Sequence, residues 1–410
     1  MVPITADSPR WLERHWWRGR LARLRLCLWL LTVLLVCSAQ LLGQGPTGQD
    51  RQAPQAALAA CPALTVAHRD SVVPGTGVAV SADGRWLAQF VHTNRGAELT
   101  LLDRDARKAQ RVELDRPQLP PGVTWRVAEL AFSPGGDLLA VRSTGAIWVL
   151  ASASARLLYQ IGLDAEKQIY PGQLSLARGQ LAVIFWPPES YLAYARPKQP
   201  VEARIYDALS GKLLRRIMLA LETPEEWSEL MLSPGGERLA VLMRATRWPG
   251  KARLAVFAAD TGKLLWQKKL SAEDVAWSGD GQRILALGGE LVWLDAHTGK
   301  KVQEANTHVR FTEYQKLRLS EPTNTAAGHF VGYSPLRRAL DMADRRDRRV
   351  LLWRLDTGKS LCDVRLDPGR RVDAWLTARG ELIALEESYE VRPALELLRA
   401  AEIVTYRLPQ

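Results

Sequence analysis

Two short turn motifs recur along residues 64–410, and they constrain the fold more than any other feature of the sequence. One combines Ser with Gly, as in Ser233-Pro234-Gly235-Gly236, and the other is Asp-Thr-Gly-Lys, as at residues 260–263. Gly supplies the positive φ of a tight turn, and Ser or Asp hydrogen-bonds the turn backbone. The flanking runs alternate apolar and polar residues, which is the pattern of a half-buried strand. Each repeat therefore predicts four antiparallel strands with a tight, a long and a tight connection.

The number and spacing of the repeats favour a β-propeller. The first turn recurs at intervals of 43 to 56 residues, the range of a four-stranded propeller blade. It begins at Ser81, Ser133, Ala177, Ser233, Ser278, Ser334 and Thr377. A parallel β-helix also repeats strands, but its period is shorter and it lacks paired hairpin turns. We predict an all-β, seven-bladed β-propeller over residues 63–410.

The last repeat holds only three strand patterns, at residues 371–377, 381–386 and 402–408. An open ring would leave an unpaired strand edge, so another segment is expected to complete the sheet. We predict that residues 63–69 form the outer strand of the seventh blade. Cys61 then lies beside the strand that carries Cys362, and two alternatives stay open: a disulfide in an oxidising compartment or two separate thiols.

The N-terminal region has the pattern of a membrane anchor. Residues 1–25 hold six Arg among three Trp, and residues 26–42 contain no charged residue. A basic flank before an apolar run is typical of a cytoplasmic N-terminus followed by a membrane span. We favour an uncleaved signal-anchor helix at 26–42; a signal peptide cleaved near Ala39 and lipidation at Cys37 are alternatives. Residues 43–62 are predicted to be a flexible linker, and the propeller is predicted to be periplasmic or otherwise extracytoplasmic.

The connections divide between two faces of the predicted disc. Antiparallel connections alternate between faces, so the tight turns share one face (the tight-turn face), while second-to-third loops and blade links share the other (the loop face). The long insertions belong to the loop face; they include residues 185–200, 244–253, 342–349 and 388–401.

Tyr, Trp and Arg are enriched in interface hot spots. The predicted partner-binding residues are Trp125, Trp186, Tyr191, Tyr194, Trp227, Arg244, Arg247, Trp248, Arg253 and Tyr314. In the alternative interpretation, these loops cap the disc and each Trp packs on its own blade.

Motifs for catalysis or metal binding are missing from the sequence. The six His are scattered, without HExxH or paired Cys/His spacing, and there is no GxSxG, P-loop, GxGxxG or CxxCH motif. Carboxylates such as Glu225, Glu226 and Glu229 are candidates for a central channel, but acid–base catalysis needs a positioned pair. We expect no catalytic, metal-binding or cofactor-binding residues.

Some repeats resemble known propeller families. The segments AFSPGGDLLAV, LSPGGERLAV and AWSGDGQRILAL are similar to the inner hairpin of bacterial WD40-like propellers. The segments FAADTGKLLWQ and WLDAHTGKK are similar to the repeat of quinoprotein-like (PQQ-like) propellers. The resemblance implies propeller architecture. Enzymatic quinoproteins hold PQQ with adjacent cysteines, which this chain lacks. The resemblance therefore implies no cofactor.

These patterns predict a non-catalytic, membrane-anchored propeller that acts as a protein–protein interaction scaffold in a bacterial envelope complex. The alternative is a propeller enzyme, a hydrolase or degenerate quinoprotein, with its site at the channel mouth. The expected partners are a protein on the loop face and the membrane at the N-terminal helix. The net charge of +11 suits anionic partners. We nevertheless expect no nucleic-acid partner, because the propeller is predicted to lie on the far side of the membrane, and no small-molecule ligand.

Overall fold

The computed structural model divides the chain into two compact units, Met1–Ala56 and Ala57–Gln410. It describes residues 65–72, 77–93, 96–119, 127–162, 170–186, 201–219, 226–245, 252–272, 274–287, 291–305, 316–319, 329–333, 349–354, 360–365, 370–377, 379, 381–392 and 395–407. The predicted segments 1–25, 26–42 and 43–62 lie outside these residues. Within the described part, no helix is long and apolar enough to cross a membrane.

The described strands form seven four-stranded antiparallel sheets. The first contains β2 (Gly77–Val80), β3 (Trp86–His92), β4 (Gly96–Asp103) and β5 (Lys108–Asp115). The second contains β6 (Val127–Phe132), β7 (Leu138–Ser143), β8 (Ala146–Ala151) and β9 (Arg156–Gly162). The third contains β10 (Tyr170–Ala177), β11 (Gln180–Trp186), β12 (Val201–Asp207) and β13 (Leu213–Leu219). The fourth contains β14 (Glu226–Leu232), β15 (Arg238–Ala245), β16 (Ala252–Ala258) and β17 (Leu264–Leu270).

The remaining sheets continue this order. The fifth contains β18 (Asp274–Trp277), β19 (Arg283–Leu287), β20 (Leu291–Asp295) and β21 (Lys301–Ala305). The sixth contains β22 (Lys316–Leu319), β23 (His329–Tyr333), β24 (Arg349–Arg354) and β25 (Ser360–Arg365). The seventh contains β26 (Arg370–Leu376), β27 (Glu381–Arg392), β28 (Leu395–Arg407) and β1 (Thr65–Val72). The predicted all-β, propeller-like fold is confirmed.

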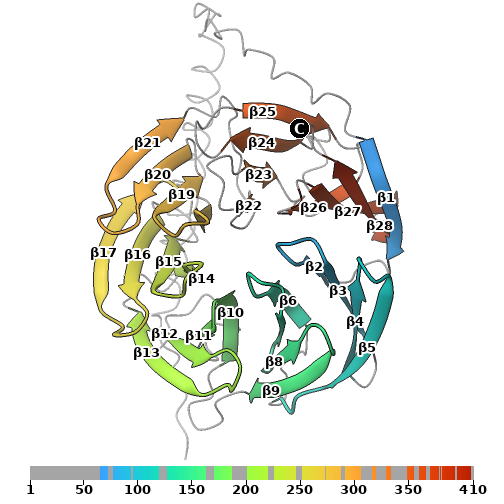
Figure 1. The fold of residues 1–410 in the computed structure, drawn as a ribbon, viewed down its shortest axis with the longest axis horizontal. Coiled ribbons are helices and arrows are strands. Elements are labelled where there is room, and N and C mark those ends of the chain that lie inside the picture. The colour runs from blue at the N-terminus through green and yellow to red at the C-terminus, as the bar shows by residue number, and fades with distance from the viewer. Residues whose placement is uncertain are drawn as a thin grey trace, which may run out of the picture. The chain divides into compact units, whose positions relative to one another are not determined.

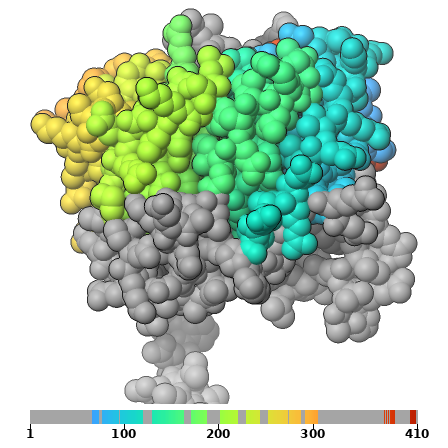
Figure 2. All heavy atoms as spheres, turned by 90° about the horizontal axis from the view of Figure 1, so that it is seen from below, coloured from blue at the N-terminus to red at the C-terminus, as the bar shows by residue number. Residues whose placement is uncertain are grey.

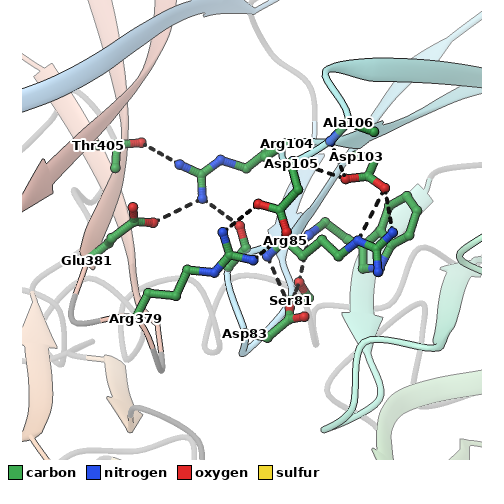
Figure 3. A network of polar contacts seen from close by, with 12 residues as sticks. Ser81, Asp83, Arg85, Asp103, Arg104, Asp105, Ala106, Arg379, Glu381 and Thr405 are labelled. Atoms are coloured by element: carbon green, nitrogen blue, oxygen red, sulfur yellow. Dashed lines mark hydrogen bonds and ion pairs between the residues drawn. The ribbon is translucent and has the colours of Figure 1, made fainter.

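The N-terminal strand completes the last sheet, as the sequence predicted. β1 pairs with β28 in antiparallel register, from Thr65 opposite Arg407 to Val72 opposite Ala401. The first sheet is also bonded to the last through Arg104, which donates to Glu381 at 3.2 Å and to Thr405 Oγ1 at 3.1 Å (Figure 3). The two ends of the described chain are therefore joined by backbone pairing and by side chains.

Neighbouring sheets pack on one another in chain order around a ring (Figure 1). Buried clusters join the first sheet to the second, the second to the third, the third to the fourth and the fourth to the fifth. Inner strands β18, β22 and β26 contact one another in turn. Val80 and Leu87 of the first sheet share a cluster with Trp375 and Ile383 of the seventh. Most apolar burial thus lies between sheets, so each blade stabilises its neighbours.

The tight turns have the chemistry that the motifs predicted. Gly136 and Gly262 have φ values of 72° in the first and second turn types, respectively. In the first turn type, the hydroxyl oxygen of Ser133 accepts a hydrogen bond from the backbone N–H of Leu138 at 3.0 Å. The same bond joins Ser233 and Arg238 at 3.1 Å. The Ser and Gly of the motif therefore close the inner hairpins and fix the register of the first two strands.

Two details of the predicted strand order are wrong. The turn at Ser334 is predicted to lie between the first and second strands of the sixth blade, but it follows β23, so it begins the connection to the third strand. Its Ser-Pro ends a strand, yet Leu336-Arg337 lacks the Gly that a tight hairpin needs. The predicted loop at 388–401 is instead mostly strand, because β27 and β28 stay paired until Arg392 faces Leu395.

Candidate functional site

The inner strands surround a central cavity of about 370 Å³. Side chains and backbone from β2, β6, β10, β14, β18 and β26 line it. These strands come from six different sheets. The cavity is therefore a property of the ring, and no single blade could form it.

Three carboxylates and one amide line this cavity at a repeated position. They are Glu129 on β6, Gln173 on β10, Glu229 on β14 and Asp274 on β18. Each lies four residues before the first position of its tight turn. Four strand residues span about 13 Å, so these groups lie toward the loop-face end of the cavity. We define them as the channel polar ring.

The members of the channel polar ring have different partners. Glu129 Oε2 accepts from Arg142 Nε at 3.0 Å and from the backbone N–H of Leu174 at 3.4 Å. It thereby links the second sheet to the third. Asp274 is 8% exposed, and its Oδ1 accepts from the N–H of Val275 at 2.9 Å. Glu229 is half-buried. The ring is part of the packed structure. Because Arg142 balances the charge of Glu129, Glu229 and Asp274 are the members that make this end of the cavity acidic.

The opposite end of the cavity is lined by turn residues. Ser81, Ala82, Ser133, Pro134, Pro234 and Gly279 are small or uncharged. The Ser81 hydroxyl is occupied within its own turn, because it donates to Asp83 at 2.5 Å and accepts from the N–H of Trp86 at 2.8 Å. The two ends of the cavity therefore differ in charge, and the acidic end is the one on the loop-face side.

The geometry limits the chemistry of this site. Among the described residues, no group of three or more His, Cys, Asp or Glu side chains is placed to hold a metal ion. The carboxylates come from separate sheets, so they act through their summed field. A cavity with acidic groups and low-dielectric walls attracts cationic groups. The arrangement suits a Lys or Arg side chain of a bound partner.

Sequence reasoning identified only Glu229 of this ring. Glu226 lies on β14 but is not among the lining residues, and Glu225 lies outside the described residues. Glu129, Gln173 and Asp274 were missed. The signal that could have found them is their constant offset of four residues from the turn, which becomes visible only after the repeats are aligned on that turn.

Two predicted partner-binding residues, Trp186 and Arg253, have described surroundings near the contact between the third and fourth sheets. Trp186, at the end of β11, is half-buried and packs against the cluster that contains Met243. Arg253, on β16, is 7% exposed, and its Nη2 donates to Met243 Sδ at 3.3 Å. Trp186 also covers Gly172 of its own sheet. This packing on its own sheet is what the alternative interpretation expects. Part of the indole is nevertheless exposed.

The other predicted residues are placed only in part. Trp227 on β14 and Arg244 on β15 are directly opposite each other in the strand register. Cys362 lies on β25 opposite Leu352, and Cys61 is outside the described residues, so their disulfide stays a prediction. The predicted residues that lie outside the described residues are Trp125, Tyr191, Tyr194, Arg247, Trp248 and Tyr314.

A second polar site is buried between the second and third sheets. Glu202 and Arg204 of β12 are 4% and 6% exposed, and Arg204 Nε donates to Glu202 Oε1 at 2.6 Å. The Arg204 guanidinium also lies 4.2 Å from the centre of the Phe185 ring. Burial raises the pKa of the adjacent Tyr206. This pair is enclosed, so its role is in the packing of the two sheets.

Comparisons with known proteins give the fold alone. Neither a protein-family model nor a curated protein sequence matches the chain. A chain in a crystal structure of the mitotic checkpoint complex aligns with a TM-score of 0.55 at 13% identity, covering 84% of this chain and 96% of that one. The structure of the Dos1 propeller aligns with a TM-score of 0.47 at 11% identity, covering 81% and 80%. Both neighbours are WD40-type propellers.

Proposed function

We propose that this protein is a non-catalytic interaction scaffold, a closed seven-bladed ring that presents its loop face to a protein partner. The observation that carries the proposal is the asymmetry of the central cavity. The channel polar ring lies toward the loop face, and uncharged turn residues line the other end. Propellers commonly use such a rigid disc to hold binding residues on their connections.

The partner that fits this end of the cavity carries a basic segment. Glu229 and Asp274 come from neighbouring sheets, and Glu129 lies on the second sheet. A Lys or Arg side chain entering the cavity would meet carboxylates on more than one side. Trp186, half-buried at the loop-face end of β11, would supply apolar contact area on the same face, as aromatic anchors do in hot spots.

We further propose that the scaffold works at a bacterial membrane. The support comes from the sequence, because the basic residues 1–25 precede the uncharged run 26–42. Such an anchor would place the propeller in the periplasm. The loop face would then bind an envelope protein.

The test is capture of a partner by the full-length chain from solubilised membranes, with bound proteins identified by mass spectrometry. Glu229→Lys is expected to reduce capture of that partner at least tenfold, because it reverses a charge in the channel polar ring. The matched control is Glu113→Lys, which changes an exposed residue on the outer strand β5. Arg244→Glu combined with Arg247→Glu tests the predicted loop-face residues. Capture that survives all of these changes would contradict the proposal.

A further inference from the structure

The exposed large apolar side chains of the described residues are concentrated on the outer strands. Their exposed fractions range from 42% to 63%. They are Val66, Leu157, Leu209, Leu214, Met218, Leu264, Leu265 and Val302. Seven lie on an outer strand, and Leu209 lies in the turn that leads to one. The exposed large apolar side chains of the described residues therefore gather on the outer wall of the ring.

Three of these residues occupy the same position in consecutive sheets. Leu214, Leu265 and Val302 are each the second residue of their outer strand, in β13, β17 and β21, and each is the residue that the strand pairing skips at a β-bulge. Leu157 of β9 faces Leu150, as Leu264 faces Phe257, so it lies at the neighbouring position. We define Leu214, Leu265 and Val302 as the rim belt. Each outer strand begins just after the second tight turn of its sheet, so the rim belt lies at the tight-turn end of the wall. Figure 2 shows the outer strands β5, β9, β13 and β17 side by side, coloured from cyan to yellow.

The rim belt is surrounded by positive charge. The turns and outer strands at 156–162, 207–219, 260–270 and 295–305 hold nine Lys and Arg against four Asp and Glu. Of the acidic groups, Asp207 accepts bonds from Ser210 and Asp295 from Thr298 within their own turns. Glu304 pairs with Lys301. These carboxylates keep their charge, but they are outnumbered, so the surface as a whole is cationic.

Edge protection explains only part of this pattern. Lys and Arg on an outer strand discourage pairing with a second sheet, so the charges alone would need no partner. Protection gives no reason for an exposed Leu or Val at the same position in three consecutive sheets. Apolar residues among Lys and Arg are the pattern of a surface that lies on anionic lipid, with the apolar groups entering the headgroup layer.

The pairing in the seventh sheet shows at which end of the ring the chain enters it. Thr65, the first residue of β1, is opposite Arg407, and Arg407 is also opposite Glu381, which follows the tight turn of the seventh sheet. The chain thus enters the propeller at the tight-turn end. Only 22 residues, 43–64, separate Thr65 from the uncharged run 26–42. A flexible linker of that length has an end-to-end distance of about 25 Å.

We propose that the rim belt and its surrounding cations form a lipid-binding surface that rests on an anionic membrane. The occupant is the layer of acidic lipid headgroups, contacted by Arg215, Arg216 and Lys263, with Leu214 and Leu265 at the apolar boundary. The tight-turn rim then faces the lipid, and the loop face is left open for the protein partner. The surface would act together with the predicted anchor, but its residues are separate from the anchor.

The test measures hydrogen–deuterium exchange of the full-length chain mixed with vesicles. One set contains phosphatidylcholine alone, and the other contains about one third phosphatidylglycerol, so insertion of residues 26–42 is common to both. Anionic vesicles are expected to slow exchange at least threefold in peptides covering 211–219 and 262–270. Peptides covering β5, whose second residue is Ala109, serve as the internal control. Equal exchange with the two vesicle types would overturn the proposal.

Variants and a second probe separate lipid binding from binding of an acidic polypeptide. Arg215→Glu with Arg216→Glu is expected to abolish the slowing, and so is Leu214→Glu with Leu265→Glu. Arg111→Glu, an exposed charge reversal on β5, is expected to leave the slowing unchanged. Poly-glutamate is the probe for an acidic polypeptide. Slowing by poly-glutamate without slowing by anionic vesicles would replace lipid by an acidic protein as the occupant.

Discussion

Arg379 and Asp105 form a two-bonded ion pair across the junction of the last and first sheets. Arg379 Nη1 lies 2.6 Å from Asp105 Oδ1, and Nη2 lies 2.7 Å from Oδ2 (Figure 3). The pair joins residues 274 positions apart in the chain. Parallel bonds of this kind fix geometry as well as charge. It adds a side-chain bond to the closure that β1 makes through the backbone.

This pair gives a pH-dependent contribution to stability. The bond from Arg379 lowers the pKa of Asp105, so the folded state favours the carboxylate. The stabilisation is present above the unfolded pKa of about 3.9 and is lost as the pH falls through the lower folded value. Asp105→Asn is expected to lower Tm by about 1–3 °C at pH 7. The difference from wild type should disappear near pH 2 in thermal unfolding; a difference that is constant from pH 7 to pH 2 would contradict the assignment.

Removal of β1 tests the closure itself. Without residues 65–72, β28 becomes an unpaired outer edge, which invites pairing with other chains. We expect the deletion variant to aggregate and to unfold at a lower urea concentration. A synthetic peptide covering 63–74 should restore monomers when it is added during refolding, while a scrambled peptide of the same composition should not. Size-exclusion chromatography distinguishes these results, and a monomeric deletion variant of wild-type stability would show that β1 is dispensable.

The buried pair of Glu202 and Arg204 is expected to respond differently to single and double substitution. Arg204→Ala leaves the Glu202 carboxylate buried without its partner, which should cost about 3–5 kcal/mol. Replacing both with apolar residues, Glu202→Leu and Arg204→Met, removes the desolvated charges and should cost much less. Urea unfolding of the single and double variants measures both. Equal losses in the two variants would indicate that shape, rather than charge, is what matters there.

Tyr159 illustrates how one sheet is bonded to the next. Its hydroxyl, on β9 of the second sheet, donates to the Ala208 carbonyl oxygen of the third sheet at 3.0 Å. Trp266 Nε1 makes the corresponding bond from the fourth sheet to Ala296 of the fifth at 2.9 Å. We expect Tyr159→Phe to cost about 1 kcal/mol.

The Tyr159 bond also has a pH signature. Burial raises the pKa of Tyr159 above its ordinary value, so the proton is held more tightly in the folded state. The contribution is complete below the unfolded pKa of about 10 and is lost as the pH rises toward the folded value. Between pH 9 and pH 11 the wild type should therefore lose more stability than Tyr159→Phe does. Parallel curves for the two proteins in urea unfolding would contradict this.

The fold was predictable because its signals are local. Ser233 and Gly236 form a tight hairpin turn through a side-chain hydrogen bond and a positive φ. Repetition of that turn at a regular spacing predicts the four-stranded sheets. Ser334 misled the prediction because Ser-Pro ends a strand whether or not a hairpin follows. The site was less predictable because it depends on alignment between sheets. Glu129 and Asp274 line one cavity only because their inner strands lie side by side around the ring. Arg253 is buried and bonded to Met243, which its own segment of sequence does not reveal.

Gly172 provides the sharpest test of Trp186, a predicted loop-face residue whose packing is described. A Cβ at position 172 would lie 2.4 Å from Cδ1 of the Trp186 indole and 3.0 Å from the backbone oxygen of Ile184, so Gly172→Ala must displace the ring. Overpacking of this kind costs about 1–3 kcal/mol, and with Trp186→Ala in the same chain the cost should shrink because the clash is removed. If Trp186 is also a binding anchor, Gly172→Ala and Trp186→Ala should each weaken partner capture, whereas Tyr159→Phe, a destabilising change away from the loop face, should not when the folded fractions are matched. If the indole only packs on its own blade, stability should fall while capture by the folded protein stays at the wild-type level. Capture assays at matched folded fractions therefore distinguish an interface residue from a packing residue at this position.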